Sequence, residues 1–307
     1  MQRLVATGLL LAASCWAACA TGAPPRPRAE GAAIEPTLWR ILRADGSEAY
    51  YLLGSVHVGR GAPPRFPAAV ERAFRQADEL VLEFDPTTEP SRREGERFMS
   101  RYALIAPPES LRDRVSSRVL VALDAYLEER GEPLAPYLAL EPWALVEILG
   151  EEAKSRRGLD PAFGVDRYFA ERAVGRMPVV ALETAEDQLR TLAGLPPEVH
   201  EHRLMEALTD PDGLGQRSDA LLRAWERGDD ATVERLLFDD LERSPALRTF
   251  YERMIFDRNE RMAGRLAQLA RDGRLRFAVL GIGHLLGPRS VPALLHGRGF
   301  RIQKRQR

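Results

Sequence analysis

The sequence predicts an α/β fold in which a mainly parallel central sheet carries large helical insertions. Short apolar runs recur between stretches of helical periodicity, which is the pattern of strands alternating with helices. Several of these runs end in glycine or in a carboxylate, as strands often do where they leave a sheet. No low-complexity tract or linker divides residues 37–307, so we expect a single domain there.

Six short apolar runs are the predicted strands. They lie at residues 38–42, 49–53, 79–85, 177–183, 275–280 and 300–302. The first two flank Asp45 and Gly46, a turn dipeptide that favours a hairpin. Helical spacing over residues 68–77, just before the third run, indicates a βαβ unit with parallel strands.

Two longer regions of helical periodicity are the predicted insertions. They span residues 91–173 and 198–271, and a shorter helix is expected at residues 288–295. We expect the first region to cover the sheet or to form a cap. Because segments inserted around a rigid sheet often carry specificity, both regions are expected to shape a binding site.

The composition excludes some classes of protein. Lysine and arginine number 44 against 45 aspartate and glutamate, so the formal charge of −1 gives no bias toward nucleic acid or other polyanions. Both cysteines fall within the first 20 residues. The predicted domain therefore contains neither a disulfide framework nor a cysteine-ligated zinc site.

The first residues have the pattern of an export signal. Arg3 supplies a positive charge, residues 4–13 form an apolar run, and small residues follow through Ala20. The apolar run is shorter than the about 20 residues of a membrane-spanning helix. The predicted organisation is a signal peptide at residues 1–20, a flexible tether at residues 21–36 and the folded domain at residues 37–307.

Two cysteines in this segment allow either of two forms of export, with or without a lipid anchor. Cys15 and Cys19 each follow small residues and resemble a degraded lipobox, whose cysteine is lipidated after cleavage. Neither has the expected leucine three residues upstream, and plain cleavage near Ala20 would remove both. We therefore expect a periplasmic protein or a lipoprotein anchored to the outer membrane. The sequence does not indicate an oligomeric state.

Four acidic or imidazole side chains follow predicted strands at the points where the strands end. They are His57, Glu83, Glu183 and His284. Because the carboxyl ends of parallel strands meet at one edge of a sheet, we expect these side chains to lie together. His57 and His284 share a strand-Gly-x-x-His context, in which Gly54 and Gly281 permit a tight exit from the strand.

Such a set of side chains suits two kinds of hydrolytic centre. Imidazole and carboxylate groups ligate zinc, manganese or cobalt, and three such ligands plus water form a hydrolytic site. The same groups also act without metal, as a general base on water with a partner that fixes the imidazole tautomer. The sequence contains neither a Gly-x-Ser-x-Gly elbow nor a His-Glu-x-x-His motif.

The three remaining histidines have simpler interpretations. His200 and His202 lie in a charged helical stretch with Glu198 and Glu201, which predicts a solvent-exposed helix face. His296 lies near the end of the last predicted helix, where an imidazole favours the helix dipole.

Several motifs together resemble the TraB/GumN family, which includes the pheromone-shutdown proteins and is related to the Tiki metalloproteases. The segments that carry the resemblance are residues 51–59 (YLLGSVHVG), 77–83 (ADELVLE), 164–166 (GVD), 181–188 (ALETAEDQ), 258–259 (RN) and 280–285 (LGIGHL). Their order matches from about Trp39 to the C-terminus. The wider superfamily is similar to the erythromycin esterases and the haem-binding ChaN lipoproteins, which implies an α/β sheet with helical insertions.

The resemblance also implies roles for individual residues. His57, Glu83 and His284 match active-site positions, and with Glu183 they would hold a divalent manganese, cobalt or zinc ion. Without metal, the two histidines would serve as general base and orienting partner. Arg258 would stabilise an oxyanion or fix a substrate carboxylate, although a helix-surface ion pair is the alternative.

Two further positions are carried over from the resemblance. Asp166 and Asn259 match family positions, but capping of a helix explains Asp166 equally well.

The sequence thus predicts an exported metal-dependent, peptidase-like hydrolase that acts on a peptide or small molecule. A metal-independent esterase would use the same residues. The alternative from another class is a periplasmic binding protein that sequesters a peptide, haem or metal, and a structural envelope protein with a vestigial site is a third. Glu83 separates hydrolase from haem binder, because water activation needs a carboxylate and haem ligation by histidine does not.

Overall fold

The computed structural model describes residues 33–305. The predicted signal peptide, both cysteines and most of the predicted tether lie outside the described residues. The last residues of that tether pack onto the domain: Ile34 is buried, and its backbone N–H donates to the carbonyl of Arg65 at 3.2 Å. None of the helices within the described range is long and apolar enough to cross a membrane.

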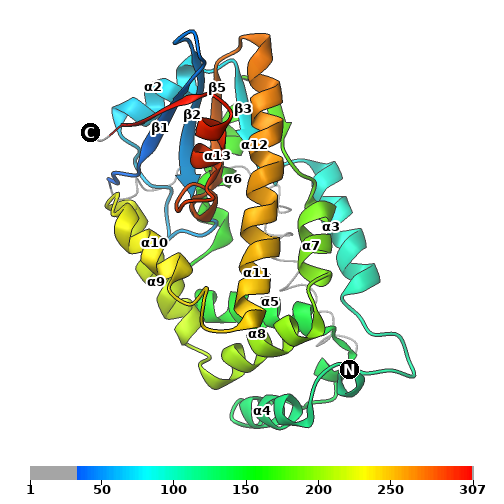
Figure 1. Ribbon diagram of the computed structural model, residues 1–307. Helices are drawn as coiled ribbons and strands as arrows, with labels where there is room; N and C mark the ends of the chain where they lie inside the picture. The colour runs from blue at the N-terminus through cyan, green and yellow to red at the C-terminus, as the bar shows by residue number, and fades with distance from the viewer. Residues whose placement is uncertain (1–32, 306–307) are drawn as a thin grey trace.

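A six-stranded mixed sheet forms one end of the molecule, with the strand order β4-β3-β5-β2-β1-β6 (Figure 1). The strands are β1 (Leu38–Leu42), β2 (Glu48–Ser55), β3 (Glu79–Leu82), β4 (Val179–Ala181), β5 (Arg276–Gly281) and β6 (Arg301–Arg305). The strands β4, β3, β5 and β2 are parallel to one another, whereas β1 and β6 each run antiparallel to the neighbouring strand. The predicted α/β fold with a mainly parallel sheet is confirmed.

The antiparallel edge begins with the predicted hairpin. β1 and β2 pair antiparallel, and the turn between them holds Gly46 at a φ of 88°, which glycine adopts without strain. The carboxylate of Asp45 accepts the backbone N–H of Ser47 at 2.9 Å, which closes the turn. Asp45 and Gly46 therefore act as the sequence predicts.

Four helices pack near the sheet. They are α2 (Ala68–Gln76), α6 (Val165–Ala173), α12 (Asp257–Leu269) and α13 (Val291–Gly297). Phe74 of α2 and Phe169 of α6 meet Phe277 of β5, with ring centroids 4.9 to 5.5 Å apart. These buried rings fix α6 against the centre of the sheet, and so fix the position of the residues at its first turn.

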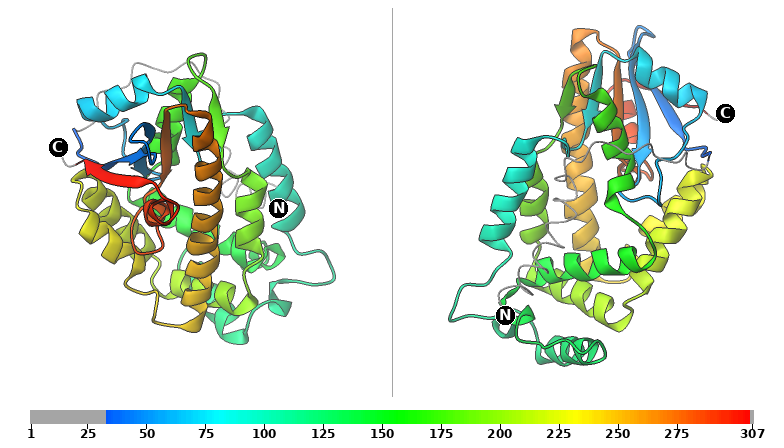
Figure 2. Two further views of the ribbon diagram at one scale, coloured as in Figure 1. Left: turned by 45° about the horizontal axis from the view of Figure 1, so that its top comes forward. Right: turned by 180° about the vertical axis from the view of Figure 1, so that it is seen from behind.

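The remaining helices extend away from the sheet, as the views in Figure 2 show. They are α3 (Glu89–Tyr102), α4 (Ser117–Glu128), α5 (Pro142–Arg156), α7 (Ala185–Ala193), α8 (Pro197–Thr209), α9 (Gly213–Glu226), α10 (Asp230–Phe238) and α11 (Pro245–Tyr251). Helix α5 begins with a proline, which suits a first turn, and it packs against α8 and α9. A second hydrophobic cluster joins α3, α4, α5, α7 and α8, whereas buried residues of α6, α9, α10 and α12 belong to the core around the sheet. The two predicted insertions thus contribute both to the core of the sheet and to a separate helical body.

One continuous helical column connects the two bodies (Figure 1). It consists of α11, a five-residue π-helical segment (Glu252–Phe256) and α12. π-Helical turns are rare and occur frequently at functional sites, because the extra residue shifts the side chains that follow. Arg258 and Asn259 come directly after this turn, and both are buried.

Candidate functional site

Four parallel strands deliver the predicted residues to one edge of the sheet. Glu183 follows β4, Glu83 follows β3, His284 follows β5 and His57 follows β2, so the order of the strands is also the order of these side chains. The backbone N–H of Glu183 donates to the carbonyl of Glu83 at 2.7 Å, which extends the pairing of β3 and β4 by one step. The expected convergence of strand-end side chains is present.

Glu83 lies at the centre of this group and is only 6% exposed. Its Oε1 accepts the backbone N–H of Gly281 at 2.5 Å, and its Oε2 accepts Nη2 of Arg258 at 2.6 Å. The side-chain amide of Gln188 also donates to Oε2, at 3.3 Å. Both oxygens of this buried carboxylate are therefore held by donors from three other parts of the chain.

Arg258 reaches the strand ends from α12 and joins the two carboxylates. Its Nε and Nη2 donate to Oε2 of Glu183 at 3.0 and 2.8 Å, while Nη1 donates to the carbonyl of Met254 at 3.1 Å. The sequence left a role on substrate or a helix-surface ion pair as alternatives. The structure shows a buried ion pair in place of one on the helix surface: the guanidinium lies between Glu83 and Glu183, where it neutralises charge in the centre. A role of Arg258 on substrate stays a prediction.

His284 is buried and its tautomer is fixed. The amide nitrogen of Asn259 donates to the carbonyl of Arg289 at 2.7 Å, so the amide oxygen is the atom that faces His284. His284 Nδ1–H donates to that oxygen at 2.6 Å, and Nε2 is left as an acceptor 3.6 Å from Oε2 of Glu83. Burial lowers the pKa of His284 to about 4, so the ring is neutral at pH 7.

His57 has the opposite environment. Its side chain is 57% exposed, and Nδ1 lies 3.2 Å from a carboxylate oxygen of Asp166 in the first turn of α6. Desolvation opposes the charged ring, but the charges of Asp166 and Glu83 outweigh it and raise the pKa of His57 to about 9. Gly164 permits this approach, since a Cβ there would lie 2.8 Å from the carbonyl oxygen of His57.

Gly281 is the point on which the three groups converge. A Cβ at this position would lie 2.9 Å from Oε1 of Glu83 and 3.4 Å from both His57 Nε2 and His284 Cδ2. The absence of a side chain is what lets the carboxylate and the two rings approach the backbone here. The close approach of these groups thus explains why the first position of the second Gly-x-x-His motif is a glycine.

The ionisation of Glu83 is set by the surrounding cations. Burial alone would raise the pKa of this carboxyl, but the positive charges of His284, Arg258 and His57, with the Gly281 N–H, lower it to about 2. Since His284 is neutral at pH 7, Arg258 and His57 carry this effect under ordinary conditions. The centre therefore holds one ionised carboxylate between a neutral and a charged imidazole.

The predicted metal site has a poor donor arrangement. Glu183 and Glu83 both face the Arg258 guanidinium, and a divalent ion bound to them would lie beside this fixed positive charge. Among residues 33–305 no group of three or more histidine, cysteine, aspartate or glutamate side chains is placed to hold a metal ion. Metal binding by His57, Glu83, Glu183 and His284 therefore stays a prediction from the sequence.

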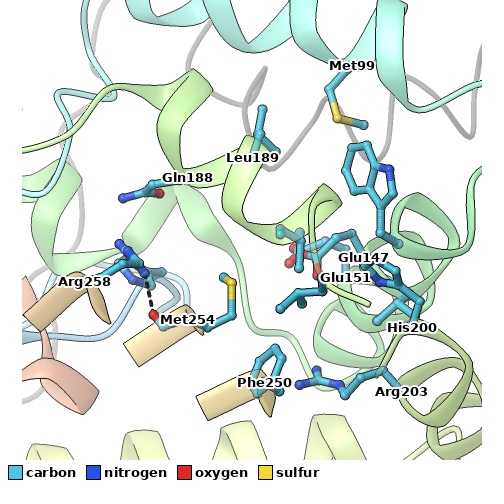
Figure 3. A pocket seen from close by; sticks show the side chains of 15 residues that line it. Met99, Glu147, Glu151, Gln188, Leu189, His200, Arg203, Phe250, Met254 and Arg258 are labelled. Carbon is cyan, nitrogen blue, oxygen red and sulfur yellow. Dashed lines mark hydrogen bonds between the residues drawn. The ribbon is translucent and has the colours of Figure 1, made fainter. Parts of the chain in front are cut away.

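A cavity of about 270 Å³ leads from this centre into the helical body (Figure 3). Arg258 and Gln188 lie at one end of it (Figure 3), His57 also lines it, and most of the remaining lining is apolar. A concave apolar space that ends at a cluster of polar groups is the usual form of a small-ligand site.

One cavity residue has a different environment from the one that the sequence predicts, and another was not predicted as a site residue. His200 was expected on a solvent-exposed face, but it is 8% exposed and lines the cavity, because α8 packs against α5. Gln188 contacts both Glu83 and Glu183. Its place four residues after the helix cap Thr184 was a local signal that it faces back toward the end of β4.

The fold and the cluster define a class: an α/β protein with a two-histidine, two-carboxylate centre at the carboxyl ends of parallel strands, beside a cavity in helical insertions. The chain belongs to the TraB/PrgY/gumN family, whose model matches residues 37–304. This confirms the resemblance seen in the sequence motifs.

Two bacterial relatives are similar along nearly the whole domain. The chain is 24% identical over 275 residues to YbaP, an uncharacterized protein of Escherichia coli (strain K12), covering 84% of this chain and 97% of the relative. The same identity and coverage hold for YbaP of Shigella flexneri. No solved structure matches the chain.

Proposed function

We propose that this protein is a hydrolase that activates water with its own side chains at the strand ends. In this proposal Glu83 and His284 hold the water, His57 protonates the leaving group, and the cavity holds the substrate. The bond that suits these groups best is an amide of the peptide type, because a leaving amine needs the proton that a charged imidazole supplies.

The proposal rests on two hydrogen-bond acceptors that face each other across a short gap. His284 Nε2 and Glu83 Oε2 are 3.6 Å apart, and neither atom brings a proton to this gap at pH 7. A water molecule that donates to both at about 2.8 Å would give His284 Nε2 a donor and add a further donor to Glu83 Oε2, with a lone pair of the water left for attack. A buried pair of facing acceptors is otherwise unfavourable.

The proposed reaction balances without any further reactant. The oxygen of the water attacks the substrate carbonyl, and its proton passes to His284 Nε2, where the charge of Glu83 stabilises the imidazolium. The C–N bond then breaks, and His57 Nε2 gives its proton to the leaving nitrogen. The proton on His284 returns to His57 through solvent, which restores both rings.

Arg258 and Asn259 act as positioning residues in this scheme. Arg258 keeps Glu83 ionised and oriented by holding it against Glu183. Asn259 keeps the lone pair of His284 directed at the water by accepting from Nδ1. Export to the periplasm, with or without a lipid anchor, stays a prediction from the N-terminal sequence.

The test compares Glu83→Gln with Glu186→Gln, the substitution of a partly exposed glutamate on α7 that pairs with Arg190. Purified proteins would be assayed on peptide p-nitroanilides and p-nitrophenyl esters, after chelation and after addition of Mn²⁺, Co²⁺ or Zn²⁺. Cleavage that survives chelation, is lost in the first variant and persists in the second supports the proposal.

The other results distinguish the remaining hypotheses. Cleavage that appears only with added metal would favour the metal-dependent hydrolase predicted from the sequence. A ligand retained through purification without turnover in any condition would favour a binding protein.

A further inference from the structure

Helix α5 presents a stripe of side chains to the cavity, away from the strand ends. Trp143, Glu147 and Glu151 are spaced four residues apart, so they lie on one face of the helix, and all three line the cavity. In Figure 3 the two glutamates lie across the cavity from Arg258 and Gln188. The far end of the cavity is therefore acidic on the α5 side.

Glu147 differs from its neighbour in its contacts. Lys154 donates to the carboxylate of Glu151, whereas Glu147 makes no hydrogen bond or ion pair with any residue of the described part of the chain. Burial raises the pKa of Glu147, while Lys154 and Arg203 oppose the rise and Glu151 adds to it. A half-buried carboxylate without a partner is costly unless a ligand supplies one.

The surroundings of Glu147 favour an apolar ligand body. The apolar lining consists of Met99, Trp143, Val146, Leu189, Leu192, Leu195, Phe250 and Met254. Trp143 precedes Glu147 by one helical turn, and a tryptophan face beside a carboxylate is a favourable place for an ammonium group.

Arg203 is the competing charge in this part of the cavity. It reaches the cavity from α8, and its guanidinium lies over the ring of Phe250 at 4.3 Å from the centroid. This contact directs Arg203 to an aromatic face, whereas the carboxylate of Glu147 has no such contact. The carboxylate of Glu147, on the α5 side of the cavity, is thus the charged group that lacks a partner.

We propose that the end of the cavity beside Glu147 and Trp143 binds the protonated amine of the substrate. This inference rests on the proposed hydrolase, because it assigns a substrate class to the same cavity. The substrate is then a molecule with an apolar body and a cationic amine, whose scissile bond lies at the strand-end centre.

The experiment measures binding and does not depend on turnover. Three probes share a phenyl ring and a two-carbon chain: 2-phenylethylamine is cationic, 2-phenylethanol is neutral and 3-phenylpropanoate is anionic at pH 7. Their affinities would be measured by NMR titration of the full protein. We expect 2-phenylethylamine to bind about tenfold more tightly than 2-phenylethanol.

Three variants test which charged residue of the cavity is responsible for binding the amine. Glu147→Gln is expected to remove the preference for the amine, while Glu151→Gln on the same helix is expected to keep most of it. Arg203→Met removes the competing cation and is expected to tighten amine binding. Thermal melting would check that each variant is folded.

The proposal is overturned if the amine and the alcohol bind equally, if the wild-type protein does not bind the amine, or if 3-phenylpropanoate binds best and loses affinity in Arg203→Met. Glu83→Gln separates this inference from the proposed function. Amine binding that persists in Glu83→Gln while cleavage is lost would uphold both proposals. Amine binding by a wild-type protein that cleaves none of the substrates would uphold the amine site and reject the hydrolase.

Discussion

The two Gly-x-x-His segments have the same sequence context and opposite chemical environments. Gly54 to His57 spans the end of β2, and Gly281 to His284 spans the end of the adjacent parallel strand β5. His284 is buried against an amide, whereas His57 is half exposed against a carboxylate. The motif sets where each ring lies, and the residue that contacts Nδ1 sets the charge of the ring.

This difference gives a physical basis for separate roles. The pKa values of about 4 for His284 and about 9 for His57 lie on opposite sides of neutrality. Groups whose environments push their pKa values apart are the usual acid and base of a catalytic pair. The neutral ring then accepts a proton from water, and the charged ring donates one to the leaving group.

The largest expected effect comes from removing each ring in turn. His284→Gln should lower kcat by about 10³-fold on amide and ester substrates alike, because both need activated water. His57→Gln should cause a similar loss on amides but little loss on p-nitrophenyl esters, whose leaving group needs no proton. Steady-state kinetics on both substrate types measure this, and equal losses on both in the two variants would contradict separate roles.

A second prediction concerns the point where the groups converge. Gly281→Ala places a Cβ 2.9 Å from Oε1 of Glu83, so the carboxylate must move, and we expect about 10²-fold loss of kcat. Gly283→Ala is the matched control, because the nearest atoms to a Cβ there are 3.8 Å away. Comparable activity in the two variants, with intact circular dichroism spectra, would show that Glu83 does not need its place beside Gly281.

A third prediction exchanges the partners of the two rings. Asp166→Asn removes the carboxylate that raises the pKa of His57, so the alkaline limb of the pH–rate profile should move down from about pH 9. Asn259→Asp places a carboxylate beside His284, so the acid limb should move up from about pH 4. At pH 7 we expect changes of less than about tenfold. Limbs that stay in place in both variants would contradict the assignment of each limb to its ring.

The smallest expected effect is on the free energy of unfolding. The two rings should change this free energy with pH in opposite directions. The pKa of folded His284 is lowered from 6.5, so its contribution to the free energy of unfolding is complete above pH 6.5 and is lost as the pH falls toward 4. The pKa of folded His57 is raised from 6.5, so its contribution is complete below pH 6.5 and is lost as the pH rises through about 9. Denaturant melts of His57→Gln and His284→Gln should differ from wild type with opposite slopes in these ranges, and parallel curves would count against the shifts.

Much of the sheet and its edge could be predicted from the sequence. The apolar runs are short and bounded by turn residues, and parallel strands bring their ends together, so the positions of His57, Glu83, Glu183 and His284 follow from local patterns. The hairpin at Asp45 also follows from its turn residues. The family match confirms the resemblance carried by these motifs.

The contacts that set the charges could not be predicted in this way. Arg258 and Asn259 reach the strand ends because a π-helical turn shifts them, and helical periodicity does not reveal such a turn. The burial of His200 depends on how α8 packs against α5, which a charged local sequence conceals. The unpartnered Glu147 likewise emerges only from tertiary packing.

The two imidazoles should carry different charges at neutral pH, and NMR of the protein labelled at histidine would measure both charges. His57→Gln and His284→Gln would assign the two ring signals, which would then be followed from pH 3.5 to 10. We expect one ring that titrates near pH 9 and one that stays neutral down to about pH 4. Two rings that both titrate near the ordinary value of about 6.5 would contradict it.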